Sequence, residues 1–282
     1  MSKECCEIQP VKKITTKNLK GSWAVVTGAS SGIGAEFAKL LAQDQINLIL
    51  VARRADRLAA LGKELKEKYG IEYEVLQHDL SLPDESKKVF NEAVQNKNIQ
   101  ILINNAGIGN LGSFTQSTLE NQMQMVNINI SSLTELTYYF TNHMLHHRMP
   151  SYVINVASIA SYAAIPTFSV YCATKSFVKS FSLSLHHELA NTNISVTAVA
   201  PGGTATDFME RGGQVVHKNA HKTMMSPETV ARIGLKAAFN RKSVVVTGGL
   251  NQLITTLSKI IPENCFTKLG GYVYRLAVSE KK

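Results

Sequence analysis

One glycine-rich turn limits what this chain can fold into. Residues Thr27 to Gly34 read TGASSGIG and follow directly on the apolar segment Trp23–Thr27. The residues after the turn, 32–44, carry apolar side chains at helical spacing. A glycine turn between a buried strand and a helix is typical of a dinucleotide-binding unit, whereas the same glycines outside that context carry little information.

The three glycines of this turn have separate expected tasks. Gly28 permits the sharp turn, Gly32 lets the backbone approach a pyrophosphate, and Gly34 lets helix and strand pack closely. The free N–H groups at the start of the helix would then face the phosphates. A tight strand–helix turn that binds no ligand is the alternative.

The rest of the chain repeats the order of strand and helix. Amphipathic helices are expected over 56–69, 84–96, 119–147 and 171–191. Apolar strands are expected over 23–27, 47–54, 72–77, 99–107, 151–158, 194–203 and 243–249. This alternation predicts an α/β fold, a single doubly wound Rossmann-type domain with a mostly parallel seven-stranded sheet and a C-terminal extension.

The domain boundaries follow from the same pattern. Residues 1–20 form a polar leader, residues 21–250 the Rossmann-type catalytic domain, and residues 251–282 a basic extension packed on that domain. Residues 203–226, rich in Gly, Met and Thr, form a long irregular stretch of the kind that often serves as a lid. The extension contains LITTLSKII and GGYVYRLAV; a packed helix is favoured, and a membrane-touching or oligomer-forming segment is the alternative.

Composition excludes several classes of protein. Hydrophobic residues make up 44% of the chain, which suffices for a large core. No apolar run approaches the roughly 20 residues that span a bilayer, and the start MSKECCEIQPVKK has no secretory signal. The spacing of the cysteines fits neither a metal site nor a disulfide framework, so a cytoplasmic location and no metal are expected. The four are Cys5, Cys6, Cys172 and Cys265, of which the first two are a lipidation site only as the less favoured alternative.

Positive charge is concentrated in the last quarter of the chain. Residues 1–210 contain 18 Lys and Arg against 18 Asp and Glu, and residues 211–282 contain 12 against 3. A basic region of this kind attracts phosphates, acidic carriers or an anionic membrane surface, or it is simply a solvated face. No nucleic-acid recognition module accompanies it, so a nucleic-acid partner is not expected.

The choice of dinucleotide is indicated by the residues after the second expected strand. An acidic residue there binds the ribose 2′-hydroxyl of NAD, whereas basic residues accommodate the 2′-phosphate of NADP. This chain has Arg53 and Arg54 and no acid before Asp56, and Ser30 and Ser31 add hydroxyl groups nearby. Two guanidinium groups suit a phosphate, which predicts NADP(H). The alternative is a pair of surface charges at a helix start.

The segment YCATK, residues 171–175, places Tyr171 and Lys175 four positions apart. Such a step puts both side chains on one helix face, with Cβ atoms about 5–6 Å apart. A phenol has an unperturbed pKa of about 10, and a neighbouring ammonium lowers that pKa toward the range in which a proton donor works at neutral pH. Ser158 ends an expected strand 13 residues earlier, where its hydroxyl holds a substrate oxygen or merely caps a turn.

Several separate motifs together resemble the short-chain dehydrogenase/reductase family, in particular its single-domain NADP(H)-dependent ketoreductase-like branch. The resemblance runs from about Gly21 to Gly249. The motifs are TGASSGIG, Asp79–Leu80, NNAG at 104–107, Asn129, Ser158, YCATK and PGGTAT at 201–206.

The resemblance implies an oxidoreductase that transfers a hydride between NADP(H) and a ketone, aldehyde or alcohol. Tyr171 would donate the proton, Ser158 would position the oxygen, and Lys175 would tune the phenol and bind the ribose. Asn129 would anchor a water that resupplies protons, with Asn127 as the alternative. Ser132 stands where the family has a glycine.

The resemblance also implies where the cofactor binds. Asp79 and Leu80 would lie at the adenine, and PGGTAT would cover the nicotinamide. The cofactor-binding residues expected in all are Gly28, Ser30, Ser31, Gly32, Ile33, Gly34, Arg53, Arg54, Asp79, Leu80, Asn105, Ala106, Gly107, Tyr171, Lys175, Pro201, Gly202, Thr204 and Thr206.

The expected partners are a small apolar carbonyl substrate and further copies of the chain, as a homodimer or homotetramer. Contact with a membrane surface through the basic extension, without spanning, is an open alternative. A catalytically silent NADP(H)-binding sensor or scaffold is the alternative function. The substrate depends on loops 108–118, 159–167 and 203–226, where Phe114, Tyr162, Phe208, Met209, Met224 and Met225 indicate an apolar cavity.

Overall fold

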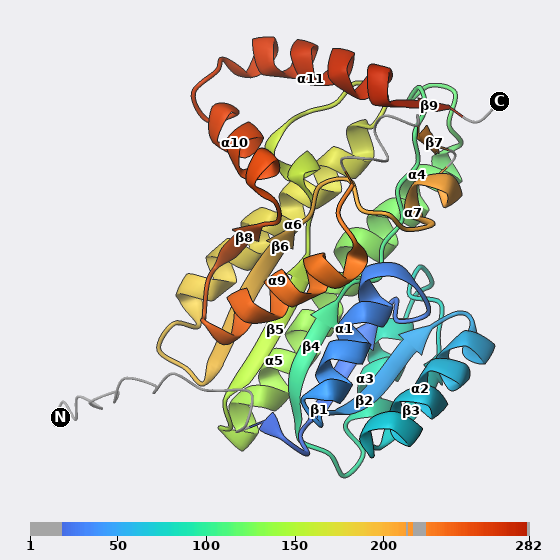
Figure 1. Ribbon diagram of the computed structural model, residues 1–282, viewed down its shortest axis with the longest axis vertical. Coiled ribbons are helices and arrows are strands. Elements are labelled where there is room, and N and C mark those ends of the chain that lie inside the picture. The colour runs from blue at the N-terminus through green and yellow to red at the C-terminus, as the bar shows by residue number, and fades with distance from the viewer. Residues whose placement is uncertain (1–18, 213, 217–223, 281–282) are drawn as a thin grey trace, which may run out of the picture.

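A parallel sheet of seven strands forms the centre of the computed structural model, which describes residues 19–212, 214–216 and 224–280 (Figure 1). The strand order is β3-β2-β1-β4-β5-β6-β8, and every neighbouring pair is parallel. The order reverses between β1 and β4, which creates a crevice at their carboxyl ends. The strands are β1 (Trp23–Thr27), β2 (Asn47–Ala52), β3 (Tyr73–Gln77), β4 (Ile99–Asn104), β5 (Ser151–Val156), β6 (Ile194–Ala200) and β8 (Val244–Val246).

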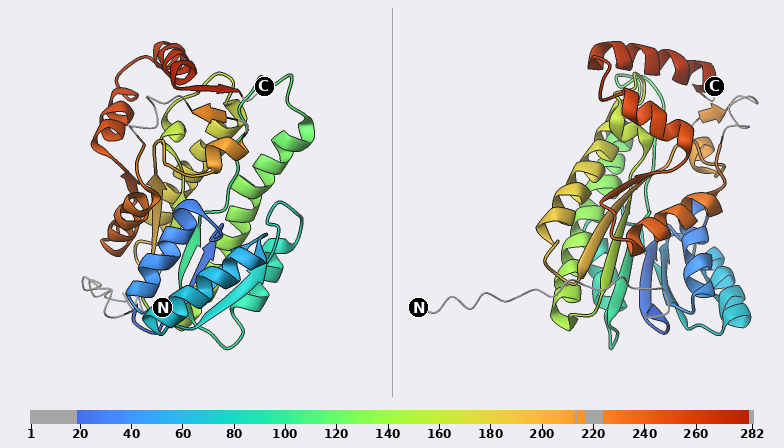
Figure 2. Two further views of the ribbon diagram at one scale, coloured as in Figure 1. Left: turned by 45° about the vertical axis from the view of Figure 1, so that its right-hand side comes forward. Right: turned by 60° about the vertical axis from the view of Figure 1, so that its left-hand side comes forward.

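Helices cover both faces of the sheet, as Figure 2 shows. One layer contains α1 (Gly32–Gln43), α2 (Ala55–Tyr69) and α9 (Pro227–Phe239). The other contains α3 (Glu85–Ala93), α4 (Leu119–Val126), α5 (Leu133–His147) and α6 (Ser169–Glu188). Strands β4, β5 and β6 are buried along their whole length, which explains their nearly continuous apolar sequences. The predicted doubly wound α/β fold is confirmed.

The expected helix over 119–147 is interrupted. A π-helical turn, η2 (Asn127–Ser132), separates α4 from α5. Helical periodicity alone does not reveal one extra residue per turn, and such turns often mark functional sites. The second strand ends at Ala52, two residues earlier than expected, because Arg54 already precedes α2.

The C-terminal extension forms two helices and a strand. Helix α10 (Gly249–Leu257) starts directly after β8 and is followed by α11 (Glu263–Ala277). Strand β9 (Val278–Glu280) then pairs antiparallel with β7 (Gln214–Val216), just after the short α7 (Phe208–Arg211). The expected irregular stretch 203–226 therefore contains two short elements, and part of it lies outside the described residues. The leader up to residue 18, with Cys5 and Cys6, lies outside them as well.

Three histidines lie in the C-terminal part of α5: His143, His146 and His147. His143 Nε2 accepts a hydrogen bond from the Ile99 N–H (3.2 Å), and His147 Nε2 donates to the Ile99 carbonyl (3.0 Å). Two of the three histidines thus form hydrogen bonds with the backbone N–H and carbonyl of Ile99, the first residue of β4.

Candidate active site

The glycine turn has the backbone conformation that its sequence predicts. Gly28 (φ 65°) and Gly32 (φ 58°) adopt left-handed conformations that other residues avoid. A Cβ atom on Gly34 would collide with the Gly28 carbonyl oxygen, so this position needs a glycine. Ile33, between Gly32 and Gly34, packs against the hydrophobic core. The turn therefore leaves backbone N–H groups of α1 open toward the crevice.

The NNAG turn is locked to the glycine turn through Thr27. The Thr27 hydroxyl accepts hydrogen bonds from the N–H groups of Asn105 (3.0 Å) and Ala106 (3.0 Å) and donates to the Ile103 carbonyl. Asn105 Nδ2 donates in return to the Thr27 carbonyl at 2.9 Å. These bonds fix the two loops that follow β1 and β4, the strands on either side of the reversal point.

The two expected phosphate-binding arginines have different surroundings. An Arg54 guanidinium nitrogen donates to the hydroxyls of Ser30 (2.8 Å) and Ser31 (3.1 Å), so these three side chains converge beside the glycine turn. Arg53 has a 61% exposed side chain and lies 3.6 Å from the Asp79 carboxylate. Asp79 also caps its own turn by accepting from the N–H and hydroxyl of Ser81. Of the two arginines, Arg54 is therefore the one whose guanidinium lies at the hydroxyl groups of the glycine turn.

Tyr171, Lys175 and Ser158 come together at the carboxyl edge of the sheet. The Lys175 Nζ atom lies 5.8 Å from the centroid of the Tyr171 ring and donates to the Val156 carbonyl at 2.8 Å. Ser158, which follows β5, hydrogen-bonds the phenol of Tyr171. Both Tyr171 and Lys175 are buried, at 7% and 5% exposure.

Without a bound cofactor, burial is the main influence on the pKa values of Tyr171 and Lys175. It raises the pKa of Tyr171, and the hydrogen bond from Ser158 opposes that shift only in part. It lowers the pKa of Lys175 to about 8. The sequence led us to expect that the ammonium lowers the phenol pKa, and the structure gives the opposite direction. The reason is that removing the phenolate from water has the largest effect on the pKa, and the neighbouring thiol of Cys172 acts in the same direction.

Asn129 lies in the π-helical turn and joins three segments. Its Nδ2 donates to the Ile108 carbonyl (2.9 Å) and to the Thr174 hydroxyl (3.0 Å), and its Oδ1 accepts from the Ile108 N–H (3.0 Å). The alternative, Asn127, points instead toward the Ser81 carbonyl. A Cβ atom on Gly107 would lie 3.0 Å from Asn129 Oδ1 and 3.5 Å from Lys175 Nζ. Asn129, unlike Asn127, therefore lies beside the lysine.

The PGGTAT segment lies over the glycine turn. The Ile159 N–H donates to the Pro201 carbonyl (2.9 Å), and the Thr204 hydroxyl donates to the Gly202 carbonyl (3.1 Å). A Cβ atom on Gly32 would approach the Thr206 methyl to 3.0 Å. The segment 201–206 thus lies beside the glycine turn, as expected. The side chain of Leu80 is instead buried in the core, so this residue offers only its backbone to a ligand.

Two aromatic residues of the site were missed by sequence reasoning. The Phe168 ring stacks on Tyr171 with centroids 4.3 Å apart and on Tyr274 of α11 with centroids 5.6 Å apart. Phe208, which was anticipated, also packs on Tyr171, with ring centroids 5.7 Å apart. Tyr274 lies 103 positions from Tyr171 in the sequence, and no motif links the two.

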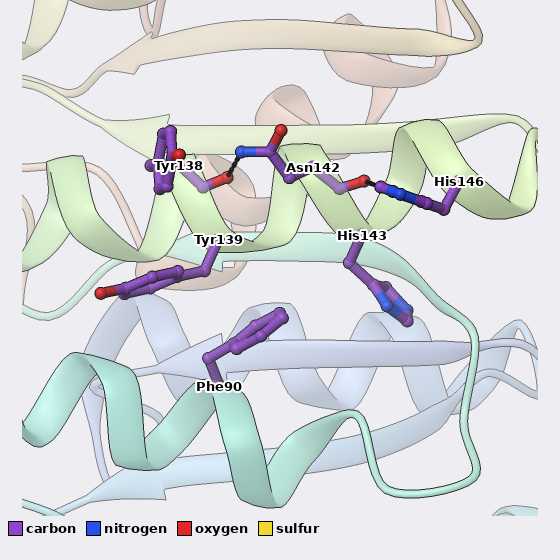
Figure 3. A pocket seen from close by; sticks show the side chains of 6 residues that line it. All are labelled: Phe90, Tyr138, Tyr139, Asn142, His143 and His146. Carbon is purple, nitrogen blue, oxygen red and sulfur yellow. Dashed lines mark hydrogen bonds between the residues drawn. The ribbon is translucent and has the colours of Figure 1, made fainter.

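A separate shallow groove lies on the outer helix layer, away from the crevice. It has a volume of about 350 Å³ and lies between α3 and α5, as Figure 3 shows. No expected site residue lines this groove. Its lining residues are Phe90, Tyr138, Tyr139, Asn142, His143 and His146. Within the described part of the chain, no group of three His, Cys, Asp or Glu side chains is arranged to hold a metal.

A glycine-rich turn at the reversal point of a doubly wound sheet defines a dinucleotide-binding, Rossmann-type protein. The sequence profile described as short chain dehydrogenase matches residues 22–214. The chain belongs to the short-chain dehydrogenase family.

Named relatives lie within the same family. A 7beta-hydroxysteroid dehydrogenase from Mediterraneibacter gnavus is 29% identical over 77% of this chain and 82% of its own length. The human very-long-chain 3-oxoacyl-CoA reductase is 30% identical over 78% of this chain and 71% of its own length. A short-chain dehydrogenase from Sphingobium yanoikuyae, solved in complex with NADPH, is 31% identical with a TM-score of 0.76 and covers 86% of this chain and 96% of its own.

Proposed function

We propose that this protein is an NADP(H)-dependent oxidoreductase that reduces a ketone or aldehyde to an alcohol, reversibly. The observation that carries the proposal is the buried cluster of Tyr171, Lys175 and Ser158 at the edge of the sheet that also holds the glycine turn. The relatives named above, a hydroxysteroid dehydrogenase and an oxoacyl reductase, support the same class of reaction.

Each residue of the cluster has a proposed task. The bound nicotinamide supplies or accepts the hydride. Tyr171 donates the proton to the substrate oxygen, and Ser158 holds that oxygen through its hydroxyl. Lys175, whose pKa is about 8, exchanges protons near neutral pH and favours the phenolate whenever it is charged. Asn129 fixes the turn at Gly107 beside the lysine, the position at which we place the proton-relay water.

The residues around the glycine turn fit NADP(H). Arg54, Ser30 and Ser31 form a donor cluster that suits a 2′-phosphate. Arg53 lies beside Asp79, where we place the adenine, and the segment 201–206, which approaches Gly32, would cover the nicotinamide. NAD(H) is the alternative cofactor, which the titration below distinguishes.

The substrate is proposed to be a largely apolar ketone. Phe168, Phe208 and Tyr274 surround the phenol of Tyr171 with aromatic surface. A steroid ketone or a 3-oxoacyl thioester suits such surroundings and agrees with the names of the relatives. Both belong in the panel of substrates tested.

We also infer the arrangement of the chain and its copies. Residues 21–250 form the catalytic domain, and residues 251–282 form an extension packed on it. Side chains on the outer faces of α5 and α6 are exposed and apolar, which suits pairing of two copies through these helices as the family resemblance implies. They include Tyr138, Leu145, Phe177 and Leu183.

The deciding experiment is Tyr171→Phe. NADPH titration monitored by fluorescence is expected to give an unchanged dissociation constant, while turnover falls by about 10²- to 10⁴-fold. Tyr272→Phe, at a 58% exposed phenol on α11, is the control and retains full turnover. Wild-type turnover in Tyr171→Phe contradicts the proposal. A wild-type protein that binds NADPH but reduces no member of a panel of steroid, acyl and aromatic ketones supports the silent sensor instead.

A further inference from the structure

Helix α10 presents its apolar side to solvent. Leu250, Leu253, Ile254 and Leu257 recur at the spacing of one helix face, and all four side chains are exposed, Leu250 at 63% and Leu253 at 56%. The opposite side of the helix faces the protein through Thr255, which is buried. A surface helix of a globular protein normally buries its apolar face, so this helix is inverted.

Helix α11 has the same arrangement. Leu269, Tyr272 and Val273 form one exposed stripe, each more than half accessible. On the other side, Gly271 lies against Pro166 and Tyr274 enters the aromatic cluster at the active site. The turn between the helices adds Ile260, which is 75% exposed.

The two stripes belong to one end of the molecule. Helices α10 and α11 follow each other and lie together at the top of Figure 1, an arrangement that the right-hand view of Figure 2 repeats. We call the eight residues the C-terminal apolar face: Leu250, Leu253, Ile254, Leu257, Ile260, Leu269, Tyr272 and Val273. The face comprises half of the sixteen large exposed hydrophobic side chains among the described residues. Such a concentration marks an interaction surface.

The charge beside this face indicates what covers it. Lys259, in the turn between the two helices, and Lys268, on α11, are exposed. Lys179 lies close enough to Lys259 for the two ammonium groups to interact. Residues 211–282 contain 12 basic against 3 acidic residues. An interface between two copies through this face would bring like charges together, whereas an anionic lipid surface attracts them.

We propose that the C-terminal apolar face docks on a membrane surface that contains anionic lipids. Amphipathic helices with apolar residues on one side and lysines at the border lie in the plane of the lipid interface. No helix in the described part of the chain is long and apolar enough to cross a bilayer. This binding does not depend on the reaction proposed above.

Vesicle co-sedimentation of the full chain tests the proposal. We expect the protein to sediment with vesicles of phosphatidylcholine and phosphatidylserine, to bind pure phosphatidylcholine vesicles more weakly, and to lose part of its binding as the salt concentration rises. Failure of the wild-type protein to bind the mixed vesicles at low salt overturns the proposal.

Charge substitutions on exposed leucines test the surface. Leu253→Glu combined with Leu257→Glu is expected to weaken vesicle binding at least about tenfold, equivalent to about 1.4 kcal/mol. Leu82→Glu, which alters a leucine of matching exposure (58%) on another part of the molecule, is the control and leaves binding unchanged. An unchanged NADPH dissociation constant shows that each variant is folded.

Lysine substitutions test the charge. Lys259→Gln combined with Lys268→Gln is expected to reduce binding to the mixed vesicles and to leave binding to pure phosphatidylcholine unchanged.

Two further outcomes overturn the proposal. The first is equal binding of the mixed vesicles by wild type and by the variant with Leu253→Glu and Leu257→Glu. A wild-type protein that self-associates in solution without lipid, and loses this association in the leucine variants, also overturns it, because the face is then an interface between copies.

Discussion

Lys175 Nζ lies 5.8 Å from the centre of the Tyr171 ring, and both side chains are almost completely withdrawn from water. Burial disfavours the charged form of each group, so it raises the pKa of the phenol and lowers the pKa of the amine to about 8. The arrangement is therefore costly for the fold, which agrees with the catalytic role that we propose for this pair. Functional sites commonly destabilise proteins in this way.

Lys175→Met is expected to stabilise the cofactor-free protein and to abolish its turnover. The folded chain buries an ammonium that the unfolded chain leaves in water, so below about pH 8 the lysine lowers the free energy of unfolding. The stabilisation at pH 7 is on the order of 1 to 3 kcal/mol, because the loss of the hydrogen bond to Val156 offsets part of the gain. Chemical denaturation without cofactor measures it.

The sign of this effect also predicts its pH dependence. The folded state releases the lysine proton near pH 8, and the unfolded state does so near 10.5. The advantage of Lys175→Met is thus largest below pH 8 and shrinks between pH 8 and 10.5. Lys63→Met, at a 74% exposed lysine, serves as the control. A variant less stable than wild type at pH 7, with a difference that does not depend on pH, refutes the argument.

Arg54→Ala is expected to weaken NADPH binding about 10- to 100-fold and to leave NADH binding nearly unchanged. Arg54 already converges with Ser30 and Ser31, and a charge-assisted hydrogen bond contributes about 1.5–3 kcal/mol. Arg53→Ala should have the smaller effect, because that side chain is mostly exposed. Arg232→Ala, which removes an arginine of the same 61% exposure elsewhere, controls for overall charge. Equal losses for the two cofactors would place the 2′-phosphate elsewhere.

Sequence reasoning predicted what depends on local pattern and missed what depends on tertiary contacts. Gly28 and Gly32 are recognisable because only glycine accepts their backbone angles, and the alternation of strands and helices determines the topology. Tyr274 was missed because its neighbour Phe168 lies more than 100 residues away and joins it only through packing. The pKa of Tyr171 was expected to be lowered and is raised instead. Helical spacing reveals the distance between Tyr171 and Lys175 but not how deeply the two side chains are buried.

His143 is expected to make the fold sensitive to mild acid. Its Nε2 accepts from the Ile99 N–H and must remain unprotonated, and burial, followed by the neighbouring His147 and His146, lowers its pKa below the usual 6.5. As the pH falls below about 6.5, the unfolded state takes up the proton first, so the free energy of unfolding decreases until the folded pKa is reached. Urea titrations at several pH values measure this decrease.

His143→Gln should flatten that pH dependence. The amide of glutamine does not titrate, so the variant loses this contribution to the slope below pH 6.5. His187→Gln, at an exposed histidine on α6, is the control and keeps the wild-type slope. If His143→Gln retains the full acid sensitivity, other groups are responsible for it.

Tyr274, in α11, stacks on Phe168 beside Tyr171. Tyr274→Ala is expected to lower kcat/KM for an apolar ketone up to about tenfold. The substitution removes a ring that stacks on Phe168, which also stacks on Tyr171, and a stacked aromatic pair contributes about 0.5–1.5 kcal/mol. Tyr274→Phe keeps the stack and should retain most of the activity. The dissociation constant of NADPH is expected to stay unchanged in both variants, because the ring that is removed stacks on Phe168, which is not among the expected cofactor-binding residues. Tyr272→Ala, at the exposed neighbour on the same helix, is the control. If Tyr274→Ala and Tyr272→Ala both match wild type in kcat/KM, helix α11 does not border the substrate, and the apolar surroundings of Tyr171 come from Phe168 and Phe208 alone.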